Sequence, residues 1–321
     1  MKTLLSLLLL TVATFAQTNP LPLGTIESSS VTCPGGFLKG AVCQSVTVAC
    51  PEAGPLTATL GIRSGKLGQT VLMMNGSEGT TVGLAEFAGT YSKFGFTVAQ
   101  FEWATAWQST GIGNTPNVMN AACQPATLLN YVANGQQIYV HAASGGSGAL
   151  AYAMSWYGLA PLVKFAVLTN GPVYSNIMLG CETPKPLSVT VYPTNGTPYD
   201  PTLYYNAGVP PDMTGFTGYQ CEPKTATSAS TNAAWMAQSI NASGAETNFP
   251  GTTLSLWYCE TAQTPNNSGG QGWQWLLTLN PSIWQLTGLF GCTGSEGLDN
   301  ATTLQGETGY NAIVAEMEAQ P

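Results

Sequence analysis

A serine set among small residues is the strongest chemical signal in the chain. Residues Ile138–Ala142 form an apolar run, broken only by His141, that predicts a buried strand. The run leads into Ser144, and a helical pattern follows over Ser147–Tyr157. A strand that turns sharply into a helix at a serine holds the hydroxyl in a strained, exposed position, suited to nucleophilic attack.

Two serines compete for this position. Ser144 has Ala142 and Gly146 two residues to either side, and Ser147 also has small neighbours at Gly145 and Gly148. The apolar strand ends more naturally just before Ser144, so we favour Ser144 as the nucleophile. A serine-rich and glycine-rich turn without chemistry remains the alternative.

A serine nucleophile normally passes its proton to a histidine. The chain contains one histidine, His141, only three residues before Ser144. Three residues of strand span about 10 Å, so we expect the ring to point into the packing layer of the sheet, as a structural histidine bonded to a neighbouring loop. The sequence therefore favours the architecture of a hydrolase more strongly than its activity.

The beginning of the chain and its cysteines indicate secretion. Met1–Ala16 has one lysine, a short apolar core and a small-residue end, which predicts a cleaved signal peptide and a mature domain over 17–321. No later segment is long and apolar enough to span a membrane. An even number of cysteines, eight, in a secreted chain favours disulfides over a metal site. Predicted loop proximity suggests the pairs Cys259–Cys292 and Cys181–Cys221.

The low charge narrows the possible partners. Charged residues make up 7% of the chain, the net charge is −8, and eight residues are basic. No basic patch can form, which argues against nucleic-acid binding. We expect no metal and no cofactor. Glycosylation sequons, which hint at a eukaryotic secretory route, lie at Asn75, Asn195, Asn241, Asn266 and Asn300.

Strand and helix patterns alternate along the chain, which predicts an α/β fold: a mostly parallel sheet with helices on both faces. The region 181–250 breaks this rhythm and is expected to form a lid insertion. Strands are expected at Gly40–Ala49, Leu56–Ile62, Val71–Met74, Phe96–Trp103, Phe165–Thr169, Thr252–Tyr258 and, more weakly, Leu289–Cys292, and further helices at Ala121–Val132, Asn232–Ile240 and Tyr310–Ala319.

From about Thr57 to Ala319 the chain resembles the α/β-hydrolase fold, in a secreted, disulfide-bonded branch. The resemblance centres on the small-x-Ser-x-Gly elbow, which here begins with Ala142 in place of the usual glycine. It implies an oxyanion hole formed by backbone N–H groups of Gly145 and of the loop after Val71–Met74, at Gly76 and Ser77. A glycan on Asn75 would crowd that loop.

The resemblance also implies an acid after the strand Thr252–Tyr258 and a histidine after the last strand. The chain has Glu260 near the first position, where an aspartate is expected at Ala262, and Glu296 at the second. Glu296 would act as the base, if burial raised its pKa, and Glu260 would orient it. Otherwise both are solvated loop carboxylates.

Three functions remain open. The first is a serine ester hydrolase acting on a small-molecule ester. The second is an inactive relative that keeps the cleft to bind an apolar ligand, a glycan or a protein. The third is a structural secreted protein. Trp103 and Trp107 follow a predicted strand end and could line a cleft, although core packing is favoured. The oligomeric state remains open.

Overall fold

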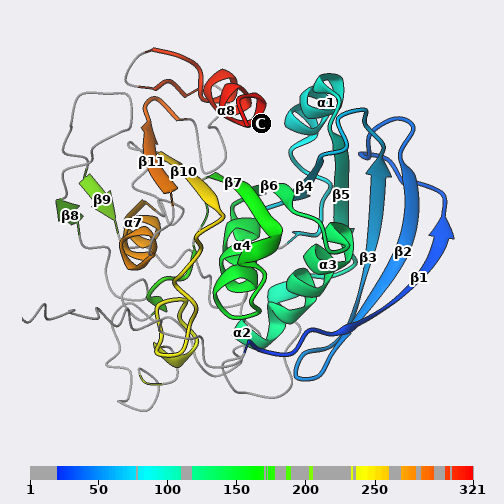
Figure 1. Ribbon diagram of the computed structural model, residues 1–321, viewed down its shortest axis with the longest axis horizontal. Helices are drawn as coiled ribbons and strands as arrows, with labels where there is room; N and C mark the ends of the chain where they lie inside the picture. The colour runs from blue at the N-terminus through cyan, green and yellow to red at the C-terminus, as the bar shows by residue number, and fades with distance from the viewer. Residues whose placement is uncertain are drawn as a thin grey trace, which may run out of the picture.

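A nine-stranded sheet forms the centre of the protein (Figure 1). The computed structural model describes residues 20–76, 79–109, 118–169, 171, 173–177, 186–188, 202–204, 233, 236–259, 269–279, 283–292, 301–303 and 306–320. The strands of the main sheet are β1 (Thr25–Val31), β2 (Val42–Cys50), β3 (Gly54–Arg63), β4 (Thr70–Met74), β5 (Thr97–Trp103), β6 (Ile138–Ala143), β7 (Val163–Thr169), β10 (Thr253–Cys259) and β11 (Ile283–Leu289).

The strand order is β1-β2-β3-β5-β4-β6-β7-β10-β11. The pairs from β1 to β5 are antiparallel, and every pair from β5 to β11 is parallel. The expected mostly parallel α/β sheet is confirmed. Because parallel strands are covered on both faces, their sequences are continuous apolar runs. A separate two-stranded sheet pairs β8 (Pro186–Ser188) with β9 (Thr202–Tyr204).

Helices cover both faces of the sheet, as expected. The described helices are α1 (Ala85–Phe94), α2 (Val118–Ala121), α3 (Cys123–Ala133), α4 (Gly145–Ser155), α7 (Gly269–Thr278) and α8 (Gly309–Glu318), with 3-10 turns η2 (Trp107–Ser109) and η3 (Ala160–Leu162). One core packs α3, α4 and α7 against the sheet, and a second packs α1 and α8 against the other face. Figure 1 shows α3 and α4 in front of the central strands, with α1 and α8 near the upper edge.

Most of the expected boundaries of these elements lie within two residues of those in the structure, and two of the differences bear on the site. The last strand is β11 at Ile283–Leu289, and the chain leaves the sheet after Leu289 instead of running on to Cys292. As an edge strand, β11 is only half-buried over its first residues, so its sequence lacks a continuous apolar run. Helix α4 begins at Gly145 rather than Ser147, because the turn after β6 leads directly into the helix.

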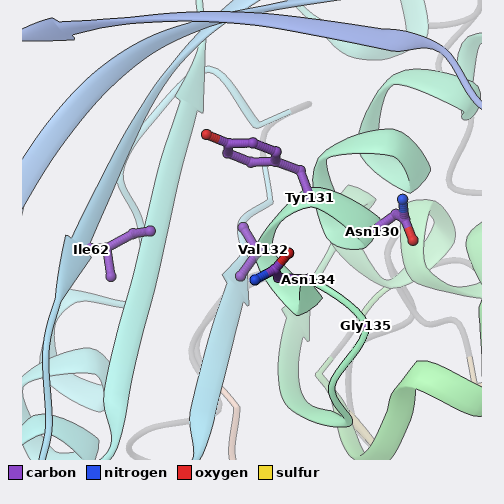
Figure 2. Close-up of a pocket in the computed structure, with 6 residues that line it drawn as sticks. All are labelled: Ile62, Asn130, Tyr131, Val132, Asn134 and Gly135. Carbon is purple, nitrogen blue, oxygen red and sulfur yellow. The ribbon is translucent and has the colours of Figure 1, made fainter.

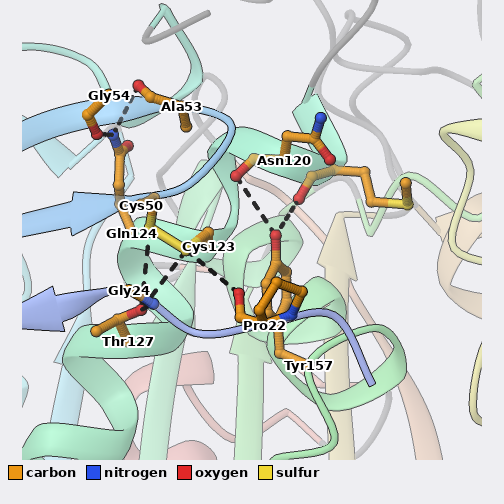
Figure 3. The surroundings of a disulfide bond; sticks show 11 residues. Pro22, Gly24, Cys50, Ala53, Gly54, Asn120, Cys123, Gln124, Thr127 and Tyr157 are labelled. Atoms are coloured by element: carbon orange, nitrogen blue, oxygen red, sulfur yellow. Dashed lines mark hydrogen bonds between the residues drawn. A yellow bond between two sulfur atoms is a disulfide. The ribbon is translucent and has the colours of Figure 1, made fainter. Parts of the chain in front are cut away.

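Disulfides join distant parts of the described chain. They link Cys33 to Cys43, Cys50 to Cys123 and Cys259 to Cys292. The last pair confirms the expected one. Figure 3 shows the Cys50–Cys123 bond tying the end of β2 to the start of α3, beside a hydrogen bond from the Gly24 amide to Thr127.

Several sequence expectations fall on residues outside the described ranges. These are the signal peptide 1–16, the Cys181–Cys221 pair and most of the insertion 181–250, including the start of the helix expected at Asn232–Ile240. Within the residues that the structure does describe, no helix has the length and apolarity to cross a bilayer.

Candidate active site

Ser144 lies at the turn between β6 and α4 with an unusual backbone conformation. Its φ is 47° and its ψ is −125°, a region that residues other than glycine rarely adopt. The Ser144 amide donates to the Thr169 carbonyl over 2.9 Å, and the Ser147 amide donates to the Ser144 carbonyl over 2.9 Å. Strain held in place by its surroundings is a feature of functional sites. This is the geometry of a nucleophile elbow.

Three glycines let neighbouring segments approach the elbow. A Cβ on Gly76 would lie 2.7 Å from the Ser144 Cβ, and a Cβ on Gly171 would lie 2.2 Å from the Ser144 carbonyl oxygen. A Cβ on Gly146 would lie 2.2 Å from the Met74 carbonyl oxygen. The end of β4, the elbow and the segment after β7 therefore meet at Ser144. Small residues around this serine are a steric requirement.

The competing serine, Ser147, is fully buried in the first turn of α4. Its hydroxyl donates to the Ala142 carbonyl oxygen over 3.1 Å. A Cβ on Gly171 would lie 2.4 Å from this same hydroxyl oxygen, so nothing larger fits there. Ser147 thus packs the turn, whereas Ser144 is half-buried at its apex.

Backbone donors lie beside Ser144. Gly145 is the first residue of α4, and the first N–H groups of a helix have no acceptor within it. They also lie at the positive end of the helix dipole, which favours a developing negative charge. Gly76 also lies close to Ser144, since a Cβ there would be 3.4 Å from the Ser144 hydroxyl oxygen. Ser77, the other expected donor of this loop, is outside the described residues.

Asn75, at the end of β4, is buried and only 2% exposed. Its Nδ2 donates to the carbonyl oxygens of Thr81, over 2.8 Å, and Phe101, over 3.2 Å. A glycan attached to this nitrogen is incompatible with the fold. The sequence predicts that a glycan on Asn75 would crowd this loop, and the burial of Asn75 rules that glycan out.

His141 is a structural residue. The ring is fully buried under α1, where Nδ1 shares a 2.9 Å hydrogen bond with the Tyr91 hydroxyl and Phe87 packs against it edge-on at 4.6 Å. Burial lowers the pKa of the imidazole to about 3, so the ring is neutral. The expected structural role holds, although the partner lies on a helix rather than a loop.

The two expected carboxylates, Glu260 and Glu296, lie outside the described residues. Glu260 directly follows Cys259, and Glu296 follows Cys292 by four residues. The disulfide between these cysteines therefore joins the starts of the two segments that carry them. Within the described part of the chain, no side chain is hydrogen-bonded to the Ser144 hydroxyl.

Sequence reasoning missed one unusual carboxyl group, Glu316 on α8. Its Oε2 accepts hydrogen bonds from the Ser255 hydroxyl, over 2.5 Å, and from Trp257 Nε1, over 3.2 Å. Burial raises the pKa of this carboxyl to about 7. Ser255 and His141 both pair with Val167, so this contact lies about three residues below the elbow along the strands. Glu316 therefore fastens α8 to the sheet, and no sequence motif signals it.

One cavity among the described residues lies away from Ser144. It has a volume of 630 Å³ and is lined by Ile62 and by residues at the end of α3 (Figure 2). The end of α3 precedes the start of β6, whereas Ser144 follows its end. The hydroxyl of Tyr131, which also lines this cavity, donates to Gln44 Oε1 over 3.0 Å. This cavity is not part of the Ser144 site.

The tryptophans serve mainly as core residues. Trp103 and Trp107 are 2% and 1% exposed, as core packing predicts. Trp103 also borders a smaller cavity of 240 Å³ beside Thr80 in the loop after β4. The described residues contain no cluster of histidine, cysteine, aspartate and glutamate that could hold a metal ion.

Comparisons with known proteins identify the fold. No protein-family model and no curated protein sequence matches the chain. An acetyl xylan esterase from Paenibacillus sp. R4 is similar in structure, with a TM-score of 0.54, 14% identity, and coverage of 94% of this chain and 90% of that one. Acetyl xylan esterase 1 from Thermoanaerobacterium sp. JW/SL YS485 has a TM-score of 0.53, 11% identity, and coverage of 92% and 87%. The protein therefore has the α/β-hydrolase fold.

Proposed function

We propose that the protein is a secreted serine ester hydrolase with Ser144 as its nucleophile. The observation that carries the proposal is the positive φ of Ser144 at the turn between β6 and α4. The Gly145 amide at the start of α4 and the closeness of Gly76 to Ser144 support this role, because acyl transfer needs backbone donors beside the nucleophile. Two proteins of similar structure are acetyl xylan esterases, which supports a small-molecule ester as substrate.

In this mechanism the Ser144 hydroxyl oxygen attacks the ester carbonyl carbon, and its proton passes to a base. The carbonyl oxygen becomes negatively charged and is stabilised by the N–H of Gly145 and by those of the loop at Gly76 and Ser77. When the carbonyl re-forms, the C–O bond to the alcohol breaks and the alcohol takes up the proton. Water then attacks the acyl-serine by the same route and releases the carboxylic acid.

The base in this proposal is Glu296, oriented by Glu260. Since His141 is buried and bonded to Tyr91, it is not available for this role. A glutamate with the ordinary pKa of about 4.3 is a weak acceptor for a hydroxyl proton, so the proposal requires that burial raise the pKa of Glu296. The Cys259–Cys292 bond supports the pairing of the two segments.

Secretion is part of the same proposal. The three disulfides among the described residues support maturation in an oxidising compartment. The apolar leader Met1–Ala16 would direct the chain there. N-glycans would then attach at Asn195, Asn266 and Asn300, since the Nδ2 of Asn241, like that of Asn75, donates to a backbone carbonyl, that of Gln274.

Steady-state hydrolysis of 4-nitrophenyl esters of increasing acyl length tests the proposal. We expect turnover by the wild type and a loss of about 10³-fold or more in kcat for Ser144→Ala. Ser147→Ala is the matched control, since it removes a hydroxyl three residues away that only packs the turn. Equal turnover by the wild type and Ser144→Ala would contradict the proposal.

A further inference from the structure

We propose that Asn75 is a positioning residue that fixes the loop after β4 so that its backbone N–H groups face the oxygen charged during attack by Ser144. This inference rests on the proposed esterase function. Asn75 touches neither Ser144 nor a substrate in this account. It acts through Gly76, which follows it and lies against Ser144.

The Asn75 amide joins the loop after β4 to the sheet. Nδ2 uses both of its hydrogens, one toward the Thr81 carbonyl within the loop and one toward the Phe101 carbonyl on β5. Between these points the Gly79 amide donates to the Gly76 carbonyl over 2.9 Å, which closes a tight turn. One buried side chain thus holds the start of the loop, at residue 75, to residue 81 of the same loop and to β5.

The oxygen of the Asn75 side chain indicates that this residue serves the geometry of the loop rather than the stability of the fold. Asn75 Oδ1 is buried and has no hydrogen-bond partner among the described residues. A buried acceptor without a partner costs about 1–3 kcal/mol. The fold tolerates this cost at a residue directly before Gly76. Gly83 encloses the same oxygen, because a Cβ there would lie 3.2 Å from it.

The substitution Asn75→Asp removes both donors with almost no change of shape. The matched control is Gln124→Glu on α3, a buried amide that also donates to two carbonyls, those of Ala53 and Gly54 (Figure 3). Both variants remove two hydrogen bonds from a side-chain amide to backbone carbonyls and introduce a carboxylate. Only Asn75 is next to the loop beside Ser144.

We expect both variants to lower Tm, and Asn75→Asp alone to lower kcat, by about 10- to 100-fold with KM within about twofold. The loss is smaller than the 10²- to 10³-fold typical of removing an oxyanion donor, because the donor is displaced rather than deleted. Hydrogen exchange of residues 79–84 should be faster in Asn75→Asp and unchanged in Gln124→Glu. If Asn75→Asp does not fold, Gly83→Ala replaces it in this test. The added methyl group of Gly83→Ala contacts Asn75 Oδ1 and leaves both Nδ2 hydrogen bonds in place, and this variant should also lower kcat.

Equal losses of kcat in Asn75→Asp and Gln124→Glu, or a change confined to KM, would overturn the inference. A folded Asn75→Asp variant with wild-type kcat would also overturn it. If Asn75→Asp does not fold, wild-type kcat in Gly83→Ala would do the same. A wild type without Ser144-dependent turnover would contradict the esterase proposal instead, and the catalytic role of Asn75 would fall with it. Exchange of residues 79–84 would then still decide whether Asn75 holds the loop.

Discussion

Gly76 and Ser144 are in such close contact that a Cβ on residue 76 would lie 2.7 Å from the Ser144 Cβ and 3.4 Å from its hydroxyl oxygen. Cβ atoms do not approach other atoms to 2.7 Å, so one of the two segments would have to move. The loop after β4 and the turn after β6 therefore fix each other's position. A serine nucleophile and its oxyanion donors need this mutual constraint, because both must reach one carbonyl group.

Gly76→Ala should reduce kcat/KM for ester hydrolysis by about 10²-fold, the loss typical of a displacement of about 1 Å in a catalytic site. The matched control is Gly89→Ala on α1, where a Cβ meets nothing within 4 Å. That variant should retain wild-type activity and gain slightly in Tm, because alanine is the better helix residue. Full activity in Gly76→Ala would show that the contact does not position the donors.

Glu316→Gln should stabilise the protein above pH 7. Because burial raises the pKa of this carboxyl to about 7, the folded state binds the proton more tightly than the unfolded state. The associated stability is complete below the ordinary pKa of 4.5 and is lost as the pH rises through about 7. The loss is at most about 3.5 kcal/mol, at about 1.4 kcal/mol per pKa unit.

Urea unfolding at pH 5 and pH 8 measures this effect. The wild type should lose stability between the two values, and Glu316→Gln should lose less. Glu318→Gln, an exposed position on the same helix, should follow the wild type. If Glu316→Gln and the wild type show the same pH dependence, the carboxyl does not titrate in this range.

Replacing His141 and Tyr91 together tests whether the histidine takes part in catalysis. Tyr91→Phe alone leaves Nδ1 of a buried imidazole without its partner, which costs about 1–3 kcal/mol. His141→Leu combined with Tyr91→Phe removes both partners and should cost less. This double variant should keep wild-type kcat, measured as ester hydrolysis. A loss of kcat comparable to that of Ser144→Ala would identify His141 as the base.

The double variant Cys259→Ala/Cys292→Ala should lose both stability and activity. The two cysteines are separated by 33 residues, and closing a loop of this length stabilises a fold by about 3–4 kcal/mol. Activity should fall because the segments that begin at Glu260 and near Glu296 lose their covalent tie. Cys33→Ala/Cys43→Ala, with a separation of only 10 residues and a place near β2, should lower stability less and leave hydrolysis unchanged.

The sequence predicts the centre of the sheet and the elbow well, because buried parallel strands are uninterrupted apolar runs. It fails where packing overrides local signals. Helix α1 has no side-chain cap and begins after Leu84, whose φ is 55°, so no start signal is present. Helix α7 begins with Gly269 and Gly270 and includes Gly272, residues with poor helix propensity. A Cβ on Gly272 would lie 2.5 Å from a methyl group of Leu256, so that side chain would have to move.

Part of the candidate site can likewise be predicted from the sequence, and part of it cannot. Small residues around Ser144 are visible in the sequence, since steric limits act on the nearest neighbours. The roles of Asn75 and Glu316 are not visible, because they depend on Phe101, Ser255 and Trp257, which only the folded sheet brings to them. Burial of the Asn75 sequon likewise follows from tertiary structure alone.

The most direct test of Ser144 as an activated nucleophile is labelling with a fluorophosphonate probe, followed by peptide mapping. Purified wild type, Ser144→Ala, Ser147→Ala and Glu296→Gln would be compared. We predict one phosphonylated serine, Ser144, in the wild type and in Ser147→Ala, no labelling of Ser144→Ala, and much slower labelling of Glu296→Gln. An unlabelled wild type, or a label on any other serine, would contradict the account.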